Sequence, residues 1–242
     1  MGAPLFLVSS LPAPGPFTVD GPEGRHAAAV MRLQVGEALR LSDGHGGMAS
    51  AVVTVVGRDT LGVSIDKVWF DEPYDPRLVV VQGIAKGDRG ELAVQAMTEV
   101  GVDEIVPWSA SRSVAQWKGE RGDRSRQRWV DTAREAAKQA RRSWLPVVPD
   151  AATTKVVAAR LGQATQALVL HEEASAPLTT VELADTGDIV LVVGPEGGVA
   201  PDELAAFERA GAVPVRLGPT VLRTSTAGVA ALAVLSARLR RW

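Results

Sequence analysis

Apolar residues along this chain follow two different patterns, and the change from one to the other divides the sequence into two regions. From Leu5 to Val68, short apolar and β-branched runs alternate with turn signals. The runs are 38–42, 51–56 and 61–68, and the turns between them are Asp43-Gly44 and Gly57-Arg58-Asp59. Such runs joined by turn dipeptides predict β-hairpins. We therefore expect a small β-barrel in this region, with one helix around Gly24 to Leu33.

A segment with two prolines, Glu72-Pro73-Tyr74-Asp75-Pro76, separates this region from a second pattern. Prolines resist both helix and central strand, so the predicted domains are 1–72 and 73–242. Beyond the segment, apolar runs alternate with helical segments; the runs are 78–84, 167–170, 189–193 and 213–217. This alternation predicts an α/β domain whose mostly parallel sheet is covered on both faces.

Three helices of the second region can be predicted from period and end signals. One begins near Arg124, and its apolar stripe comprises Val130, Ala133, Ala137, Ala140 and Trp144. Another starts at Pro201-Asp202-Glu203 and closes at Gly211. The last extends from Thr224 toward Arg240, because hydroxyl residues at its start and arginines at its end suit the caps and the helix dipole.

Composition narrows the class of protein. The 242 residues include no cysteine, which excludes a disulfide framework, thiolate zinc sites and a cysteine nucleophile. The N-terminal run 5–8 is too short for a signal peptide, and no apolar stretch is long enough to span a bilayer. We expect a cytoplasmic protein. The net charge of −2 argues against a uniformly basic nucleic-acid coat, so local charge decides whether RNA can bind.

The most informative loop is Gly194-Pro195-Glu196-Gly197-Gly198, directly after the apolar run 189–193. In parallel sheets ligands bind at the carboxyl ends of the strands, and glycines there allow a ligand to approach the backbone. Glu196 would repel phosphate, and the loop has no Gly-Lys-Ser/Thr sequence, so a nucleoside triphosphate is disfavoured. A tight strand-to-helix turn without a ligand is the alternative interpretation.

A second loop, 217–227, joins the last apolar run to the final helix and contains Gly218, Arg223 and three hydroxyl residues. Alone, it could be a helix N-cap beside a solvated arginine. Two glycine-bearing loops at successive strand ends favour a shared pocket. A third strand end, Leu170-His171-Glu172, reaches the same edge, but a lone histidine gives little support to a metal site, and none is expected.

Basic residues concentrate between Lys118 and Arg142, with Trp117, Trp129 and Trp144 among them or at the margin. Arginines beside aromatic rings can hold phosphates and stack unpaired bases, as in single-stranded RNA recognition. A solvated helix face with the tryptophans in the core is the alternative. Basic residues of the barrel could extend this surface.

These residues together resemble the RsmE family, ribosomal RNA uridine-N3 methyltransferases of the SPOUT superfamily. The similarity rests on Gly194 to Gly198, Leu217-Gly218 and Leu222-Arg223-Thr224. Further matching stretches are Lys86 with 95–102, Pro107 with 111–114, 128–129 with 135–142 and Pro146, and His26 with 30–32 and 36–37. The resemblance implies a PUA-like RNA-binding β-barrel followed by a trefoil-knotted SPOUT α/β methyltransferase domain that works as a homodimer.

The resemblance also assigns candidate residues. S-adenosylmethionine would be bound by Leu170, His171, Gly194, Glu196, Gly197, Gly198, Leu217, Gly218, Leu222, Arg223, Thr224, Ser225 and Ala227. Ribosomal RNA, in the assembled small subunit, would contact Arg25, His26, Arg32, Arg112, Arg128, Arg141 and Arg142. Many family members carry an acidic residue where this chain has Ser225, so no catalytic carboxylate is expected at that position.

The expected reaction is methylation of N3 of a uridine in small-subunit (16S) ribosomal RNA. The N3 proton is mostly retained at neutral pH, so an enzyme must remove it or stabilise the anion. The hypothesis places Arg223 and Arg112 against the uracil oxygens, with Glu172 or Glu196 assisting proton removal. The alternatives are a methyltransferase of this class with another RNA target, a non-catalytic RNA-binding protein, and an unrelated α/β enzyme that uses a nucleotide.

Overall fold

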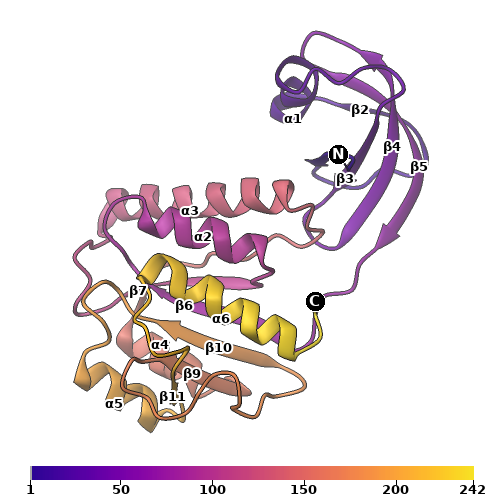
Figure 1. Cartoon of the computed structure of the whole chain (residues 1–242). Helices are drawn as coiled ribbons and strands as arrows, with labels where there is room; N and C mark the ends of the chain where they lie inside the picture. Colours follow the sequence, from indigo (N-terminus) through magenta and orange to yellow (C-terminus); the bar gives the residue numbers. More distant parts are fainter. Residues whose placement is uncertain (1) are drawn as a thin grey trace. The chain divides into compact units, whose positions relative to one another are not determined.

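The computed structural model describes residues 2–242, which form two compact units (Figure 1). The first unit comprises the residues up to Pro73 together with Ala137–Leu145, and the second comprises Tyr74–Ala136 and Pro146–Trp242. The predicted boundary between the domains, 1–72 and 73–242, lies within one residue of the boundary between the two units. The prediction differs in placing 137–145 in the second domain. Within residues 2–242, no helix is both long and apolar enough to cross a membrane.

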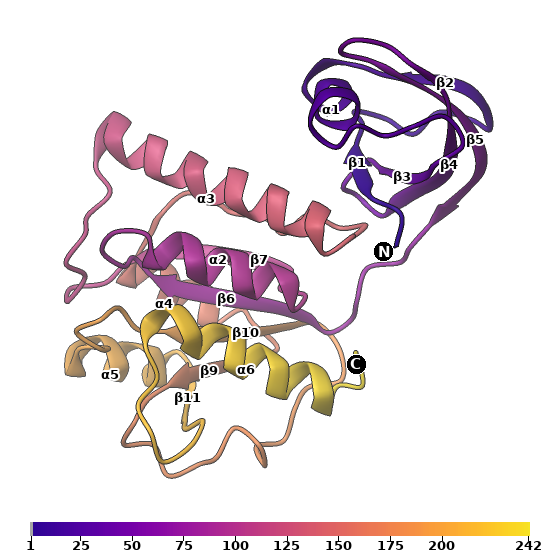
Figure 2. The ribbon, with the colours of Figure 1, turned by 45° about the horizontal axis from the view of Figure 1, so that its top comes forward.

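The first unit is built on a curved five-stranded sheet with the order β1-β3-β4-β5-β2 (Figure 2). Its strands are β1 (Leu5–Leu7), β2 (Gly15–Val19), β3 (Ala38–Ser42), β4 (Gly47–Val56) and β5 (Leu61–Phe70). The long pair β4 and β5 is antiparallel, as the predicted hairpin requires. Alternate residues such as Leu39, Val53 and Val63 are buried in one shared core, because side chains of a strand point to opposite faces in turn.

The helix expected around Gly24 to Leu33 begins and ends three residues earlier and is less regular. It consists of α1 (Gly21–Arg25) followed by the π-helix η1 (His26–Val30). The amide of Met31 donates to His26 O at 2.9 Å, five residues back, which is the wider π spacing. Arg32 then adopts a left-handed backbone with φ 55°, so the helix ends before Leu33.

The segment 137–145 belongs to the first unit because it bonds to the ends of β3, β4 and β5. The amide of Gly46 donates to Ser143 O at 2.9 Å, and the Trp144 indole donates to Asp71 O at 2.8 Å. Arg141 has φ 57°, so helix α3 (Gly119–Gln139) ends before it. The predicted helical stripe was therefore wrong at Ala140 and Trp144, which lie beyond the helix.

The second unit contains a six-stranded sheet in which every neighbouring pair is parallel, in the order β11-β9-β10-β6-β7-β8. The strands are β6 (Arg77–Gly83), β7 (Glu104–Ser109), β8 (Ala152–Thr153), β9 (Gln166–Leu170), β10 (Asp188–Val193) and β11 (Val213–Val215). The expected parallel sheet is confirmed. Strand β7 was not predicted, since Pro107 interrupts its apolar run.

Helices cover both faces of this sheet (Figures 1 and 2). Besides α3, they are α2 (Arg89–Glu99), α4 (Thr154–Leu161), α5 (Pro201–Arg209) and α6 (Thr224–Arg238). Leu78 and Val80 pack on one face with residues of α2, α3 and α6, whereas Val79 and Val81 pack on the other with α4 and α5. Burial on both faces explains why the strands are continuous apolar runs.

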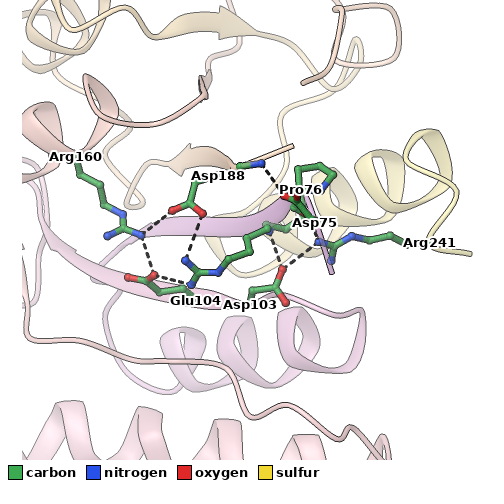
Figure 3. A network of polar contacts seen from close by, with 10 residues as sticks. Asp75, Pro76, Asp103, Glu104, Arg160, Asp188 and Arg241 are labelled. Atoms are coloured by element: carbon green, nitrogen blue, oxygen red, sulfur yellow. Dashed lines mark hydrogen bonds and ion pairs between the residues drawn. The ribbon is translucent and has the colours of Figure 1, made fainter. Parts of the chain in front are cut away.

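At the amino ends of the strands, charged side chains form a network (Figure 3). Arg77 pairs with Glu104 and Asp188, at 3.3 Å in each case, and Arg160 lies 2.8 Å from Glu104. Arg241 reaches Asp103 at 3.1 Å. This network lies at the end of the sheet opposite to the carboxyl ends of the strands, where the glycine-bearing loops begin.

Candidate functional site

A hollow of about 870 Å³ opens at the carboxyl ends of β9, β10 and β11. Leu170, Val193 and Val215 end these strands and lie in its wall. The loops that follow them, together with the start of α6, supply most of the remaining wall. We call this the strand-end hollow. Its position agrees with the expectation that two glycine-bearing loops at successive strand ends share one pocket.

The structure brings most of the candidate cofactor residues together in this hollow. Those in the wall are Leu170, His171, Gly194, Glu196, Gly197, Gly198, Leu217, Gly218, Leu222, Arg223, Thr224 and Ala227. Ser225 does not line the hollow, because it is buried within the first turn of α6. The three candidate catalytic residues, Arg223, Arg112 and Glu172, also lie in the wall.

The glycine loop 194–198 packs tightly against the end of β6. A Cβ atom on Gly83 would lie 2.5 Å from the backbone nitrogen of Pro195, so glycine is required there. Glu196 fixes the loop from the other side, because its Oε1 accepts the amide of Lys86 at 2.9 Å and lies 3.5 Å from Arg89 Nη1. The carboxylate of Glu196 therefore has a structural role in addition to its place in the wall.

Arg112 follows β7 and reaches the same loop. Its Nη1 donates to Gly197 O at 3.2 Å. The backbone beside it is anchored by Glu203, whose Oε1 accepts the amide of Ser111 and the hydroxyl of Thr154, each at 2.8 Å. Glu203 is only 6% exposed. The buried carboxylate of Glu203 thus holds the backbone next to the exposed Arg112. The sequence predicted Glu203 only as part of the acidic first turn of α5 and gave no sign of this role.

The start of α6 corrects one sequence prediction. The hydroxyl residues were expected to cap this helix, but Arg223 is the N-cap residue, and its side chain makes no capping hydrogen bond. Instead, the hydroxyl of Thr224 donates to Gly194 O at 2.7 Å and accepts Gln82 Nε2 at 2.9 Å. Thr224 therefore joins the two loops of the hollow, a contact between residues too distant in sequence to predict.

The remaining polar side chains of the wall differ in whether they bind to other residues of the protein. Within residues 2–242, neither Arg223 nor Arg112 forms an ion pair, and Arg223 is exposed. Glu172 is exposed, whereas His171 Nδ1 accepts the amide of Glu173 at 3.2 Å, a structural bond. No group of three or more His, Cys, Asp or Glu side chains in the described part of the chain could hold a metal ion.

Three candidate RNA-binding residues belong to the first unit outside 137–145. Arg25 and His26 line a second hollow of about 530 Å³; the other lining residues are Gly21, Pro22, Val30, Asp59 and Thr60. Arg25 lies 3.5 Å from Asp59, and both side chains are largely exposed. Arg32 is exposed in its left-handed turn.

Each of the other basic candidates has contacts within the protein. Arg128 lies 3.4 Å from Glu91 in the second unit, and Arg141 donates to Gly2 O at 2.8 Å in the first. Arg142 is half-buried. Trp129 is 3% exposed and packs edge to face on Trp117, with ring centroids 4.9 Å apart. Trp129 therefore belongs to the core and cannot stack on an RNA base, so for this residue the alternative interpretation holds.

Comparison with known proteins identifies the family. A family model described as an RNA methyltransferase domain matches residues 72–236, and one described as an RNA methyltransferase PUA domain matches residues 19–66. Ribosomal RNA small subunit methyltransferase E of Mycobacterium tuberculosis is 46% identical over 247 residues, covering 100% of this chain and 94% of the relative. The protein of the same name from Bacillus subtilis is 28% identical, covering 91% of this chain and 89% of the relative.

Solved structures agree. A ribosomal RNA small subunit methyltransferase E from Neisseria gonorrhoeae, bound to S-adenosyl methionine, is 27% identical with a TM-score of 0.85 and 98% coverage of both chains. A Legionella pneumophila protein in complex with the same cofactor is also 27% identical, with a TM-score of 0.85 and 98% coverage of both chains. The predicted order, a PUA-type domain followed by an α/β RNA methyltransferase domain, is confirmed. The chain belongs to the ribosomal RNA small subunit methyltransferase E family.

Proposed function

We propose that this protein transfers a methyl group from S-adenosylmethionine to N3 of a uridine in small-subunit (16S) ribosomal RNA. The observation that carries the proposal is the strand-end hollow, in which both glycine-bearing loops and the candidate arginines meet. The solved relatives with bound S-adenosyl methionine, similar over 98% of this chain, support the choice of cofactor.

The residues present fit such a cofactor. A volume of about 870 Å³ lies within the range of small-molecule pockets, roughly 300–1,000 Å³. A Cβ atom on Gly218 would meet no heavy atom within 4 Å, so packing does not require glycine there. A flat ligand lying against the backbone would require it. The proposed contacts are Leu217, Gly218 and Leu222 for the adenine part and Gly194 to Gly198 for the methionyl part.

The cofactor supplies an electrophilic methyl group on a sulfonium, and the protein's residues prepare the uridine. In the proposed mechanism, Arg223 and Arg112 face the uracil oxygens and stabilise the negative charge that develops when N3 loses its proton. Glu172 is the better proton acceptor, because it is exposed in the wall. Glu196 is less suitable, because Lys86 N and Arg89 already engage it.

The proposal extends to partners. Arg25, His26 and Arg32 in the first unit, Arg112 and Arg128 in the second, and Arg141 and Arg142 in 137–145 are the proposed RNA contacts. Small ribosomal subunits are the proposed substrate, which places the protein in the cytoplasm. A homodimer is proposed as well, and Val221, which lies on the rim of the hollow and is 79% exposed, is a residue that a second copy could cover.

The direct test is methyl transfer from labelled S-adenosylmethionine to small ribosomal subunits that lack their own N3-methyluridine, followed by nucleoside mass spectrometry. We expect labelled N3-methyluridine. Saturable cofactor binding without transfer to these subunits would point to another RNA target. Absence of cofactor binding would refute the methyltransferase activity and favour a protein that only binds RNA.

Replacing Gly218 with alanine should separate ligand approach from folding. The new methyl group meets no protein atom, so we expect the melting temperature to stay within about 2 °C of the wild type. The same methyl group would occupy space proposed for the cofactor, and we expect the Kd for S-adenosylmethionine to rise about 10-fold, measured by calorimetry. Gly83→Ala is the contrasting variant, because its Cβ would meet backbone and should lower both stability and affinity. An unchanged Kd in Gly218→Ala would contradict the proposed place of the adenine.

A further inference from the structure

Gln82 is a fully buried polar side chain that lies outside the wall of the strand-end hollow. It is in register with Val193 of β10 and Pro107 of β7, so it sits in the middle of the sheet near the carboxyl ends of the strands. The four residues before it in β6, 78–81, are all apolar and buried. A glutamine at this place calls for an explanation, because burying an amide is costly unless its bonds are made.

The directions of the hydrogen bonds can be deduced. The hydroxyl of Thr224 has one proton, and Gly194 O, 2.7 Å away, can only accept, so Thr224 donates to Gly194. Thr224 Oγ1 must then accept from the amide nitrogen of Gln82, at 2.9 Å. This orientation leaves Gln82 Oε1 buried with no donor among the described residues. An apolar residue would avoid that cost, so an amide at this place points to a role other than stability.

The bonded chain Gln82, Thr224 and Gly194 joins the two loops that form the hollow. Gly194 opens the glycine loop, and Thr224 opens α6 directly after Leu222 and Arg223; both line the hollow. The neighbour of Gln82, Gly83, packs directly on the glycine loop. The strand end thus holds one loop by packing and the other by a hydrogen bond.

We propose that Gln82 is a positioning residue for S-adenosylmethionine binding. It does not line the hollow; through the hydroxyl of Thr224 it keeps the glycine loop and the loop before α6 at the spacing that the cofactor requires. Loops already fixed in their bound arrangement lose less conformational freedom on binding, which raises affinity. This inference rests on the proposed function, because it concerns the same cofactor.

The test is Gln82→Met, which keeps roughly the volume, suits a buried site and removes both the donor and the unpaired acceptor. We expect the Kd for S-adenosylmethionine, measured by calorimetry, to rise about 5- to 10-fold. The melting temperature should stay the same or increase, and the KM for RNA should stay within about twofold. A residue needed only for folding would change the melting temperature and leave the Kd alone. A Kd within about twofold of the wild type would overturn the proposal.

Thr224 supplies a second, independent variant in case Gln82→Met does not fold. Thr224→Val keeps the shape but cannot donate to Gly194, and we expect a similar loss of affinity, whereas Thr224→Ser should recover most of it. In the double variant, Gln82→Met should add nothing to Thr224→Val, because both break the same chain. Additive losses would show that Gln82 acts by another route and would overturn the proposal.

A matched control comes from Ser236 in α6, another fully buried side chain whose hydroxyl has no hydrogen-bond partner among the described residues. It does not line the hollow, so Ser236→Ala should leave the Kd unchanged. The wild type separates the two hypotheses. If it binds S-adenosylmethionine and Gln82→Met binds equally well, only the positioning role fails. If the wild type does not bind, the proposed function fails and the positioning role with it.

Discussion

Replacing Arg223 with alanine is expected to lower kcat for RNA methylation by about 100- to 1,000-fold, the usual cost of removing a group that stabilises developing negative charge. The melting temperature should stay within about 2 °C, because the side chain is exposed. The helix-capping function of Arg223 resides in its carbonyl, which accepts the amides of Thr226 and Ala227, each at 2.9 Å. Alanine keeps that carbonyl.

Two further measurements define the role of Arg223. If its guanidinium faces the uracil, the Kd for S-adenosylmethionine should change by less than about threefold, while single-turnover methylation of the RNA slows. Arg223→Lys keeps the charge but not the planar fork and should give an intermediate rate. Arg209→Ala removes another exposed arginine, at the end of α5, and should leave the rate unchanged. Near-normal methylation by Arg223→Ala would refute the role.

The layers of the fold could be predicted because burial determines the hydrophobic pattern. Strands buried on both faces, such as β6 and β10, are continuous apolar runs, and the hairpin of β4 and β5 shows turn residues between β-branched runs. Strand β7 was missed because its proline breaks the apolar run. The segment 137–145 could not be assigned to the first unit, because that assignment depends on bonds to Gly46 and Asp71, far away in sequence.

The site was predictable to the extent that it lies at strand ends. In a parallel sheet these ends share one edge, so loops following β9, β10 and β11 had to meet. The contacts that hold the loops were missed, since Gln82 and Thr224 are 142 positions apart and Ser111 and Glu203 are 92 apart. One signal was available: Gln82 is the single polar residue within the apolar run 78–84 apart from Gly83. A polar residue in a strand that is buried on both faces indicates a hydrogen-bond partner elsewhere in the fold.

Glu196 has tertiary contacts that its position in the sequence does not predict. Its sequence position, inside a glycine loop, suggested both repulsion of phosphate and a possible proton acceptor. The structure shows that its carboxylate accepts the amide of Lys86 and lies beside Arg89, on a loop that no sequence pattern connected with it. The sequence shows that Glu196 carries a carboxylate, but whether this carboxylate is free to accept a proton depends on its partners in the folded chain.

The second large effect concerns Arg241, near the end of the chain. Its side chain is 6% exposed and donates to the carboxylate of Asp103, to Pro76 O and to Gly101 O. The guanidinium also lies over the ring of Tyr74, 4.5 Å from the centroid. These contacts attach the residues after α6 to both β6 and β7 (Figure 3). They lie at the opposite end of the sheet from the strand-end hollow.

Arg241→Ala should therefore destabilise the second unit by about 2–3 kcal/mol, measured as the free energy of urea-induced unfolding. Removing one partner of a buried ion pair takes a compensating charge away from the other partner. Breaking a buried ion pair usually costs about 3–5 kcal/mol. The loss of stability here should lie at or below the lower end of that range, because Asp103 Oδ2 still accepts the amide of Leu78 at 2.7 Å. Arg240→Ala is the matched control, because Arg240 is exposed. Its backbone is left-handed, with φ 57°, and this conformation is unfavourable for arginine and alanine alike. We therefore expect the free energy of unfolding to change by less than about 0.5 kcal/mol. Equal effects of the two substitutions would mean that the contacts of Arg241 contribute nothing beyond a surface charge.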